Sequence, residues 1–117
     1  MQKRNDLFLI NESSKAFWRQ LGSPLLVECK NWYKKIGTDE VKKFKDTMES
    51  HNIKAGILIA LKGITGTKRK DALLKIREYN QKGFQIILLN GADIESICSG
   101  ENPTDKLRER YYNLFRI

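Results

Sequence analysis

Two spacings of hydrophobic residues alternate along the chain. Short apolar runs occupy residues 6–10, a stretch that begins at Leu25, residues 54–61 and residues 84–89, and each has the length of a β-strand. The last two runs are apolar at nearly every position, which is typical of strands that are covered on both faces. The pattern therefore predicts four strands, two of them in the interior of a sheet.

Between and after these runs, apolar residues recur at helical spacing. Ser13 or Ser14 is predicted to cap a short helix that ends near Leu21. Thr38 is predicted to cap the next helix, and its apolar stripe consists of Val41, Phe44 and Met48. Further helices are predicted from about residue 68 to 81, around Ile94, Ile97 and Cys98, and after Asn102, where Leu107, Tyr111, Leu114 and Phe115 form one side.

The order of these elements predicts the architecture. Strands alternate with helices after residue 25, which favours parallel strands joined by right-handed crossovers. The first two strands are closer in sequence, so we expect them to be antiparallel. The sequence thus predicts one domain, residues 1–117, with a three-layer α/β/α fold and a mixed central sheet of about four strands.

Composition excludes several classes of protein. No apolar run approaches the roughly 20 residues that a membrane-spanning helix needs. The sequence has a single histidine, His51, which leaves little material for a histidine-based zinc site or a serine–histidine–aspartate triad. We expect Cys29 and Cys98 to be buried free thiols, which suits a reducing cytoplasm.

A formal net charge of +8 favours a polyanionic partner, and nucleic acid more than membrane. The strongest candidate for phosphate contacts is a threonine-rich loop that leads into a basic helix start, with a second basic pair after the second strand: Thr65, Thr67, Lys68, Arg69, Lys70, Lys34 and Lys35. Two further elements have alternative interpretations. The lysines of the predicted second helix, Lys42, Lys43 and Lys45, either contact DNA or form a solvated face, and Phe17, Trp18 and Arg19 either stack on bases or cover the first two strands.

The candidate chemistry lies where the second strand ends. Glu28 and Lys30 are two residues apart, so a strand projects both side chains to the same face. Asp6 lies in the preceding strand, and antiparallel pairing would bring it to the same place. Two carboxylates can hold a hard divalent cation, and an adjacent lysine can position a water molecule. The alternative is an ordinary surface ion pair on an edge strand.

An aspartate on one strand followed by Glu-x-Lys on the next resembles the PD-(D/E)xK nuclease superfamily. The sequence LLVECKNW at residues 25–32, followed by IGTDEV at 36–41, AGILI at 55–59 and GITG at 63–66, is similar to the Mrr-type branch of restriction endonuclease-like domains. The similarity covers about residues 4–95. Asn5 stands where a proline often precedes the aspartate.

The resemblance implies a metal-dependent DNA endonuclease with a restriction endonuclease-like fold. It implies that Asp6, Glu28 and the backbone carbonyl of Cys29 bind Mg²⁺ or Mn²⁺, and that Lys30 holds the attacking water. Glu12 is the nearest spare acid for a second metal ion. The alternative function is a catalytically weak or inactive nucleic-acid-binding or interaction domain of a larger protein.

Relatives of this type usually carry a helix before the aspartate, whereas five residues precede Asp6 here. We therefore expect the domain to lack the usual N-terminal helix and to expose the edge of its first strand. An exposed strand edge favours self-association, and we expect a homodimer in which this edge or the final helix forms the interface. The alternative is that the apolar side of the final helix folds back and covers this edge within one chain.

Overall fold

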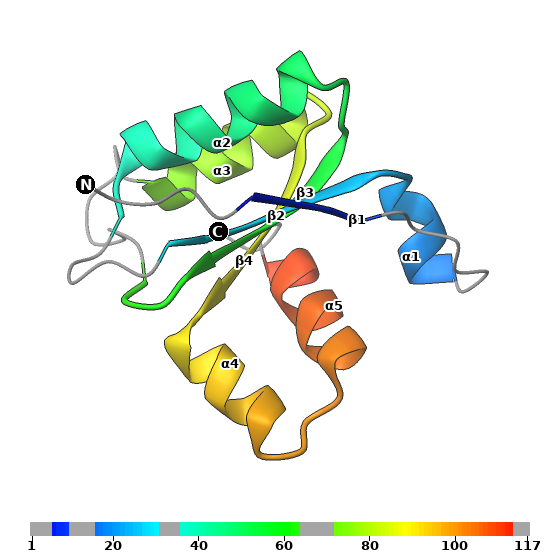
Figure 1. Ribbon diagram of the computed structural model, residues 1–117, viewed down its shortest axis with the longest axis vertical. Coiled ribbons are helices and arrows are strands. Elements are labelled where there is room, and N and C mark those ends of the chain that lie inside the picture. Colours follow the sequence, from blue (N-terminus) through cyan, green and yellow to red (C-terminus); the bar gives the residue numbers. More distant parts are fainter. Residues whose placement is uncertain (1–5, 10–15, 31–35, 64–71, 114–117) are drawn as a thin grey trace.

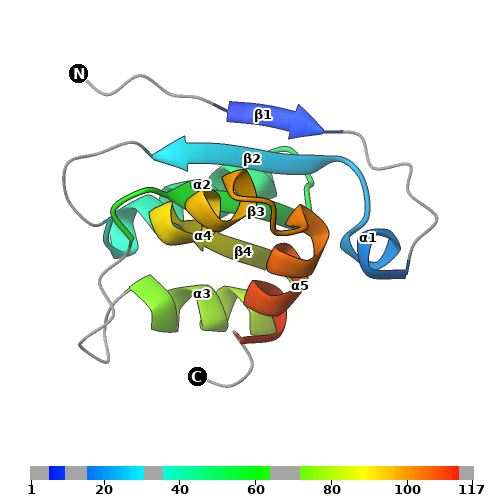
Figure 2. The same ribbon diagram turned by 90° about the horizontal axis from the view of Figure 1, so that it is seen from below.

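The computed structural model describes residues 16–30, 36–63 and 72–113, and the backbone of residues 6–9. Its four strands are β1 (Asp6–Leu9), β2 (Leu25–Lys30), β3 (Ala55–Ala60) and β4 (Gln85–Asn90). They form a sheet in the order β1-β2-β3-β4 (Figure 2). The strands β2, β3 and β4 are parallel, and β1 pairs antiparallel with β2 at one edge. The predicted α/β class and these strand directions are confirmed.

One face of the sheet is covered by α2 (Thr38–Ser50) and α3 (Ala72–Gln81), which lie side by side above the strands in Figure 1. The predicted stripe of α2, Val41, Phe44 and Met48, is fully buried against this face. The helix approaches β3 very closely, because a Cβ atom added at Gly56 would meet the Phe44 ring at 2.7 Å. A glycine in the middle of this strand is thus required by the packing of α2.

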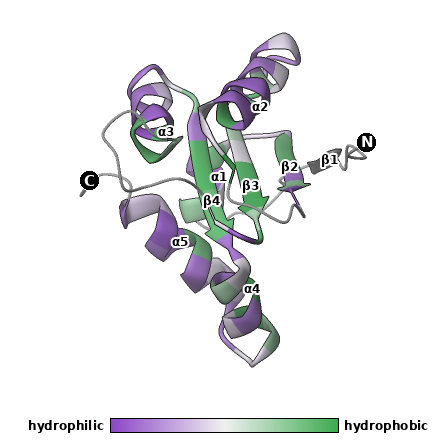
Figure 3. Ribbon diagram, turned by 90° about the vertical axis from the view of Figure 1, so that its left-hand side faces the viewer, coloured by the Kyte–Doolittle hydropathy of each residue, from purple (hydrophilic) through white to green (hydrophobic). Residues whose placement is uncertain are grey.

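The opposite face is covered by α1 (Ala16–Leu21) and α5 (Pro103–Asn113). Phe17 of α1 and Tyr111 of α5 meet edge to face, with their ring centroids 5.9 Å apart. The helix α4 (Gly91–Cys98) leaves the end of β4 and packs Ile94 against the same cluster. Figure 3 shows the mainly hydrophobic strands β3 and β4 flanked by helices that contain both hydrophilic and hydrophobic residues. The molecule therefore has helices on both faces of one sheet, as predicted.

Several sequence predictions need correction. Gly37, not Thr38, is the N-cap of α2, because its backbone N–H donates to the Glu40 carboxylate at 3.1 Å and Thr38 already lies in the helix. Both cysteines are free, as predicted, but Cys98 is exposed because it ends the peripheral helix α4. Asn90 ends β4 and also caps α4, because its side chain accepts a 2.9 Å hydrogen bond from the Asp93 N–H.

The described part of the final helix buries its apolar residues within the molecule. Leu107 and Tyr111 are 6% and 8% exposed and belong to the core beneath the sheet. They cover the α1 side of the sheet rather than the edge of β1. Leu114 and Phe115, the other two residues of the predicted apolar side, lie outside the described residues.

Candidate active site at the carboxyl edge of the sheet

Glu28 and Lys30 form a buried ion pair where β2 ends. Lys30 Nζ lies 2.7 Å from Glu28 Oε2, and the two side chains are 13% and 4% exposed. In the sheet register they stand opposite Leu58 and Ala60 of β3, so they share the face that α2 and α3 cover. The predicted placement of Glu28 and Lys30 on one face is therefore present in the structure.

The burial of this pair argues against the surface ion-pair interpretation. A charged group is costly to remove from water unless it is paired and hydrogen-bonded. Exposed ion pairs at a strand edge keep their contact with water, and they contribute little to the stability of the fold. Glu28, which is 3% exposed as a residue, belongs to the costly class. Buried charged side chains cluster at sites where they take part in chemistry or hold elements of the fold together.

Asp6 stands directly opposite Glu28 in the antiparallel pairing of β1 with β2. This register is the one that a shared site of Asp6 and Glu28 requires. The side chains of β1 lie outside the described residues, so the convergence of all three side chains stays a prediction. Glu12 also lies outside them.

Cys29 lies between the two charged residues and alternates to the other face of β2. Its thiol is half-buried and free, and burial raises the pKa of this thiol above its ordinary value. A thiol with a raised pKa is a poor nucleophile and metal ligand at neutral pH. The side chain of Cys29 thus has no chemical role in the predicted site, which would use only its backbone carbonyl.

The predicted phosphate-contact residues Thr65, Thr67, Lys68, Arg69, Lys70, Lys34 and Lys35 lie outside the described residues. The residues that flank them are described and lie together. Ile36 N–H donates to the Gly63 carbonyl at 3.1 Å, and Leu61 N–H donates to the Lys30 carbonyl at 3.3 Å. The chain therefore enters and leaves residues 31–35, and enters residues 64–71, at the same edge of the sheet as Lys30.

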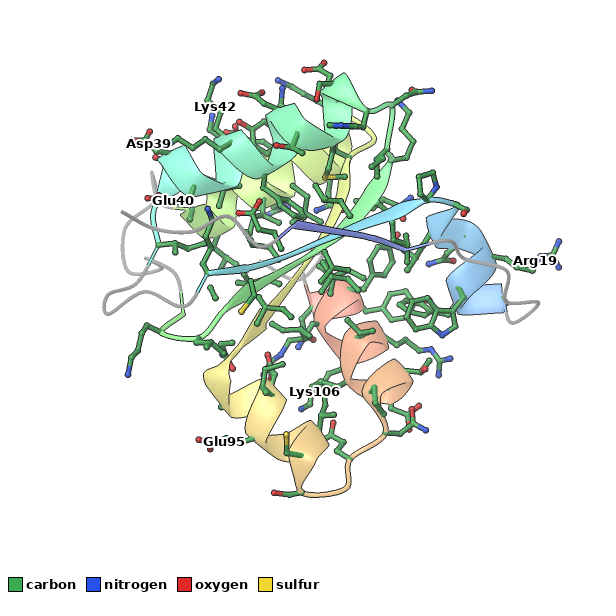
Figure 4. The ribbon with its side chains drawn as sticks, viewed as in Figure 1. Arg19, Asp39, Glu40, Lys42, Glu95 and Lys106 are labelled. Atoms are coloured by element: carbon green, nitrogen blue, oxygen red, sulfur yellow. The ribbon has the colours of Figure 1, made fainter. Side chains whose placement is uncertain are left out.

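The alternative basic face on α2 is compensated by acids of the same helix. Lys42 pairs with Asp46 at 2.8 Å, and Lys45 pairs with Glu49 and Asp46 at 3.2 Å each. These pairs raise the pKa of both lysines and lower that of Asp46, chiefly through their hydrogen bonds. The solvated interpretation of this face is therefore favoured. Figure 4 shows Lys42 pointing away from the sheet.

The aromatic residues of α1 support the covering interpretation. Phe17 is buried, and Trp18 Nε1 donates to Thr104 Oγ1 of α5 at 3.2 Å. Arg19 extends away from the body of the molecule (Figure 4). Phe17 packs edge to face with Trp18 and Tyr111, and Arg108 lies over its ring at 5.5 Å, so these contacts hold the Phe17 ring within the protein.

Within the described part of the chain, no three histidine, cysteine or acidic side chains are grouped so that they could hold a metal ion. Glu28 supplies one buried carboxylate at the edge of the sheet. A metal ion there would need further oxygen ligands, and Asp6 is the acid that the register places opposite. The donors are the hard oxygens that Mg²⁺ and Mn²⁺ prefer.

An α/β sheet with a buried Glu-x-Lys pair at the end of a strand is the framework of a restriction endonuclease-like nuclease domain. Residues 8–98 match the family of Mrr-type catalytic domains, described as restriction endonuclease, and the chain belongs to this family. The matched region contains Glu28 and Lys30 and begins just after Asp6. Searches of curated proteins and of solved structures gave no match. Among the described helices, none has both the length and the apolar character required to cross a bilayer.

Proposed function

We propose that this domain is a metal-dependent endonuclease that hydrolyses phosphodiester bonds in DNA. The buried pair of Glu28 and Lys30 at the carboxyl edge of the sheet carries the proposal. The family match supplies the class of reaction. The basic composition of the chain fits a DNA substrate.

In this proposal Asp6 and Glu28 bind Mg²⁺ or Mn²⁺ together with the backbone carbonyl of Cys29. The bound cation would supply charge stabilisation at the scissile phosphate. The Lys30 ammonium, 2.7 Å from Glu28, orients the water that attacks phosphorus. The burial of both side chains excludes bulk water from the pair and strengthens its electrostatic influence on the substrate.

Thr65, Thr67, Lys68, Arg69 and Lys70 would hold the phosphate backbone, with Lys34 and Lys35 beside them. Support comes from the Ile36–Gly63 hydrogen bond, which brings the end of the first segment to the start of the second.

We also propose a cytoplasmic location, because a compartment without disulfide formation suits the two free cysteines.

Nicking of a supercoiled plasmid tests this proposal. We expect nicking with Mg²⁺ or Mn²⁺, none with EDTA, and none by Glu28→Gln, which keeps the size of the side chain but removes its charge. Lys42→Ala is a suitable control, since Lys42 belongs to an exposed pair on α2. Cleavage that persists in Glu28→Gln would overturn the assignment.

The rival function is a nucleic-acid-binding or interaction domain of a larger protein that has lost turnover. Salt-sensitive retention on DNA without nicking would identify a binding module, whereas no retention at low salt would leave an interaction domain.

We also propose a homodimer, because β1 lies at the edge of the sheet and strand edges promote association. The burial of Leu107 and Tyr111 in the core makes the edge of β1 the better candidate for the interface than α5. Light scattering in moderate salt tests this: a single monomeric species across the micromolar range would contradict it.

A further inference from the structure

A second buried carboxylate, Asp93, lies in the first turn of α4. It is 2% exposed, and its Oδ2 accepts a hydrogen bond from the Asn90 N–H at 3.0 Å. The Asn90 side chain returns the bond to the Asp93 N–H at 2.9 Å, so the two residues close a capping box at the start of the helix. Asn90 is the last residue of β4 and stands two strands away from Lys30 in the register, with Ala60 between them.

Two cations of α5 face this carboxylate. Arg110 approaches Asp93 with Nε at 3.0 Å from both carboxylate oxygens and with Nη2 at 2.6 Å from Oδ1. Lys106 lies 3.9 Å from Oδ1, and its ammonium is shared with Glu101 and Glu109. Figure 4 places Lys106 between α4 and α5. The hydrogen bonds to Asp93 raise the pKa of Arg110, so the guanidinium keeps its charge.

The start of α4 is also pressed against the end of β3. A Cβ atom added at Gly91 would meet the Leu61 carbonyl oxygen at 2.6 Å, a distance that real Cβ atoms do not adopt. The N–H of the same Leu61 donates to the Lys30 carbonyl at 3.3 Å. An unbroken series of close contacts thus connects Arg110, Asp93, Gly91 and Leu61 to the backbone of Lys30.

We propose that Arg110 is a positioning residue for the active site: through Asp93 it fixes the start of α4, which holds Leu61 and with it the backbone of Lys30. The catalytic consequence rests on the proposed nuclease function, whereas the mechanical coupling does not. The helix α5, which follows the family-matched residues 8–98, becomes part of the support of the site. Figure 1 shows α5 on the side of the sheet opposite α2.

Amide hydrogen exchange tests the coupling directly. In Arg110→Ala we expect the Leu61 N–H, which bonds Lys30, to exchange at least about tenfold faster. The Gln85 N–H donates to the Lys54 carbonyl at 2.8 Å, at the end of the sheet where β3 and β4 begin. This amide is the internal reference, and its exchange should change far less. Arg108→Ala is the matched control on the same helix, because the contacts of Arg108 are a distant pair with Asp105, at 3.8 Å, and the ring of Phe17, at 5.5 Å, and neither lies on the proposed path. Equal acceleration at Leu61 and Gln85, or none at Leu61, would overturn the proposal.

Two further variants cover the case in which Arg110→Ala fails to fold. Arg110→Lys keeps the charge and should restore most of the protection at Leu61. Gly91→Ala leaves every charge in place but forces Leu61 to move, so it should accelerate exchange at Leu61 alone. Normal protection of Leu61 in Gly91→Ala would contradict the proposed path.

Kinetics distinguish a positioning role from simple destabilisation. For Arg110→Ala and Gly91→Ala we expect kcat for plasmid nicking to fall about tenfold while KM for DNA stays within twofold, and Arg110→Lys to recover kcat. A rise of KM with kcat unchanged would overturn the catalytic part. If the unaltered protein does not nick DNA, the proposed function fails, and exchange at Leu61 still decides whether the coupling exists.

Discussion

Glu28 and Asp93 are both buried acids, 3% and 2% exposed, yet their partners differ in kind. Asp93 is held by a helix N-terminus and by a guanidinium that comes from another helix, 17 residues away in sequence. Glu28 pairs with Lys30 on its own strand and stands opposite a second acid, Asp6, in the register. The first arrangement joins two elements of the fold, whereas the second places an acid and a lysine side by side at the end of one strand.

The comparison shows that burial alone does not identify a functional acid. A carboxylate whose partners come from different elements stabilises the arrangement of those elements. A carboxylate beside a lysine of its own strand contributes little to tertiary structure, because both groups would stay close together even if the neighbouring helices moved. The identity and origin of the partner are therefore the better guide to function.

The largest expected effect is on activity. Glu28→Gln should reduce nicking by at least about a hundredfold, as expected for the loss of a group that holds charge at the transition state. Part of its stability should be lost as well, because Gln fills the same space but leaves buried Lys30 without the charge of Glu28. If Glu28→Gln did not fold, Glu28 would be needed for the fold, as we infer for Asp93, and its separate functional role would be contradicted.

Lys30 provides the counterpart within the same site. Lys30→Ala should also abolish nicking but keep most of the Mn²⁺ affinity that Glu28→Gln loses, since a lysine positions water and does not bind the cation. Calorimetric titration with Mn²⁺ measures both variants, and equal losses of affinity would contradict the separate roles.

The next effect is on stability. Asp93→Asn removes the charge that faces Arg110 and should lower the free energy of unfolding by about 3 kcal/mol, in the range known for a broken buried pair. Lys42→Ala, which breaks an exposed pair on α2, should change it by less than about 1 kcal/mol. Urea denaturation measures both. A cost for Asp93→Asn no larger than that for Lys42→Ala would mean that the pairing of Asp93 with Arg110 contributes nothing to folding.

The local pattern of the sequence sufficed to predict the strands, the stripe of α2 and the shared face of Glu28 and Lys30, because each depends on spacing along one element. The burial of Asp93 could not be predicted in this way. An acid in the first turn of a helix usually faces solvent, and its burial depends on Arg110, which another helix supplies. The exposure of Cys98 likewise depends on how far α4 projects from the sheet.

A smaller effect concerns where DNA binds. The slope of log affinity against log salt concentration measures how many DNA phosphates the protein neutralises. Replacing Lys68, Arg69 and Lys70 with Ala should make this slope shallower by up to about 0.9 for each phosphate contact that is lost. Replacing Lys42, Lys43 and Lys45 should lower it less, because Asp46 and Glu49 already compensate two of these lysines. A larger decrease from the second set would move the binding face from the edge near Glu28 to α2.

The smallest effect comes from two lysines that differ mainly in position. Lys62 and Lys82 are both exposed, each precedes a glycine with positive φ, and neither has a carboxylate within ion-pair distance among the described residues. Lys62 follows the end of β3 at the Glu28 edge, where Gly63 is fixed by hydrogen bonds with Ala60 and Ile36. Lys82 precedes β4 at the opposite edge. If DNA lies over the end of the sheet that carries Glu28, Lys62→Ala should make the slope of log affinity against log salt concentration shallower by about 0.9. Lys82→Ala should leave this slope unchanged. Equal slopes for the two variants would show that the position of the basic residues relative to Glu28 has no bearing on DNA binding.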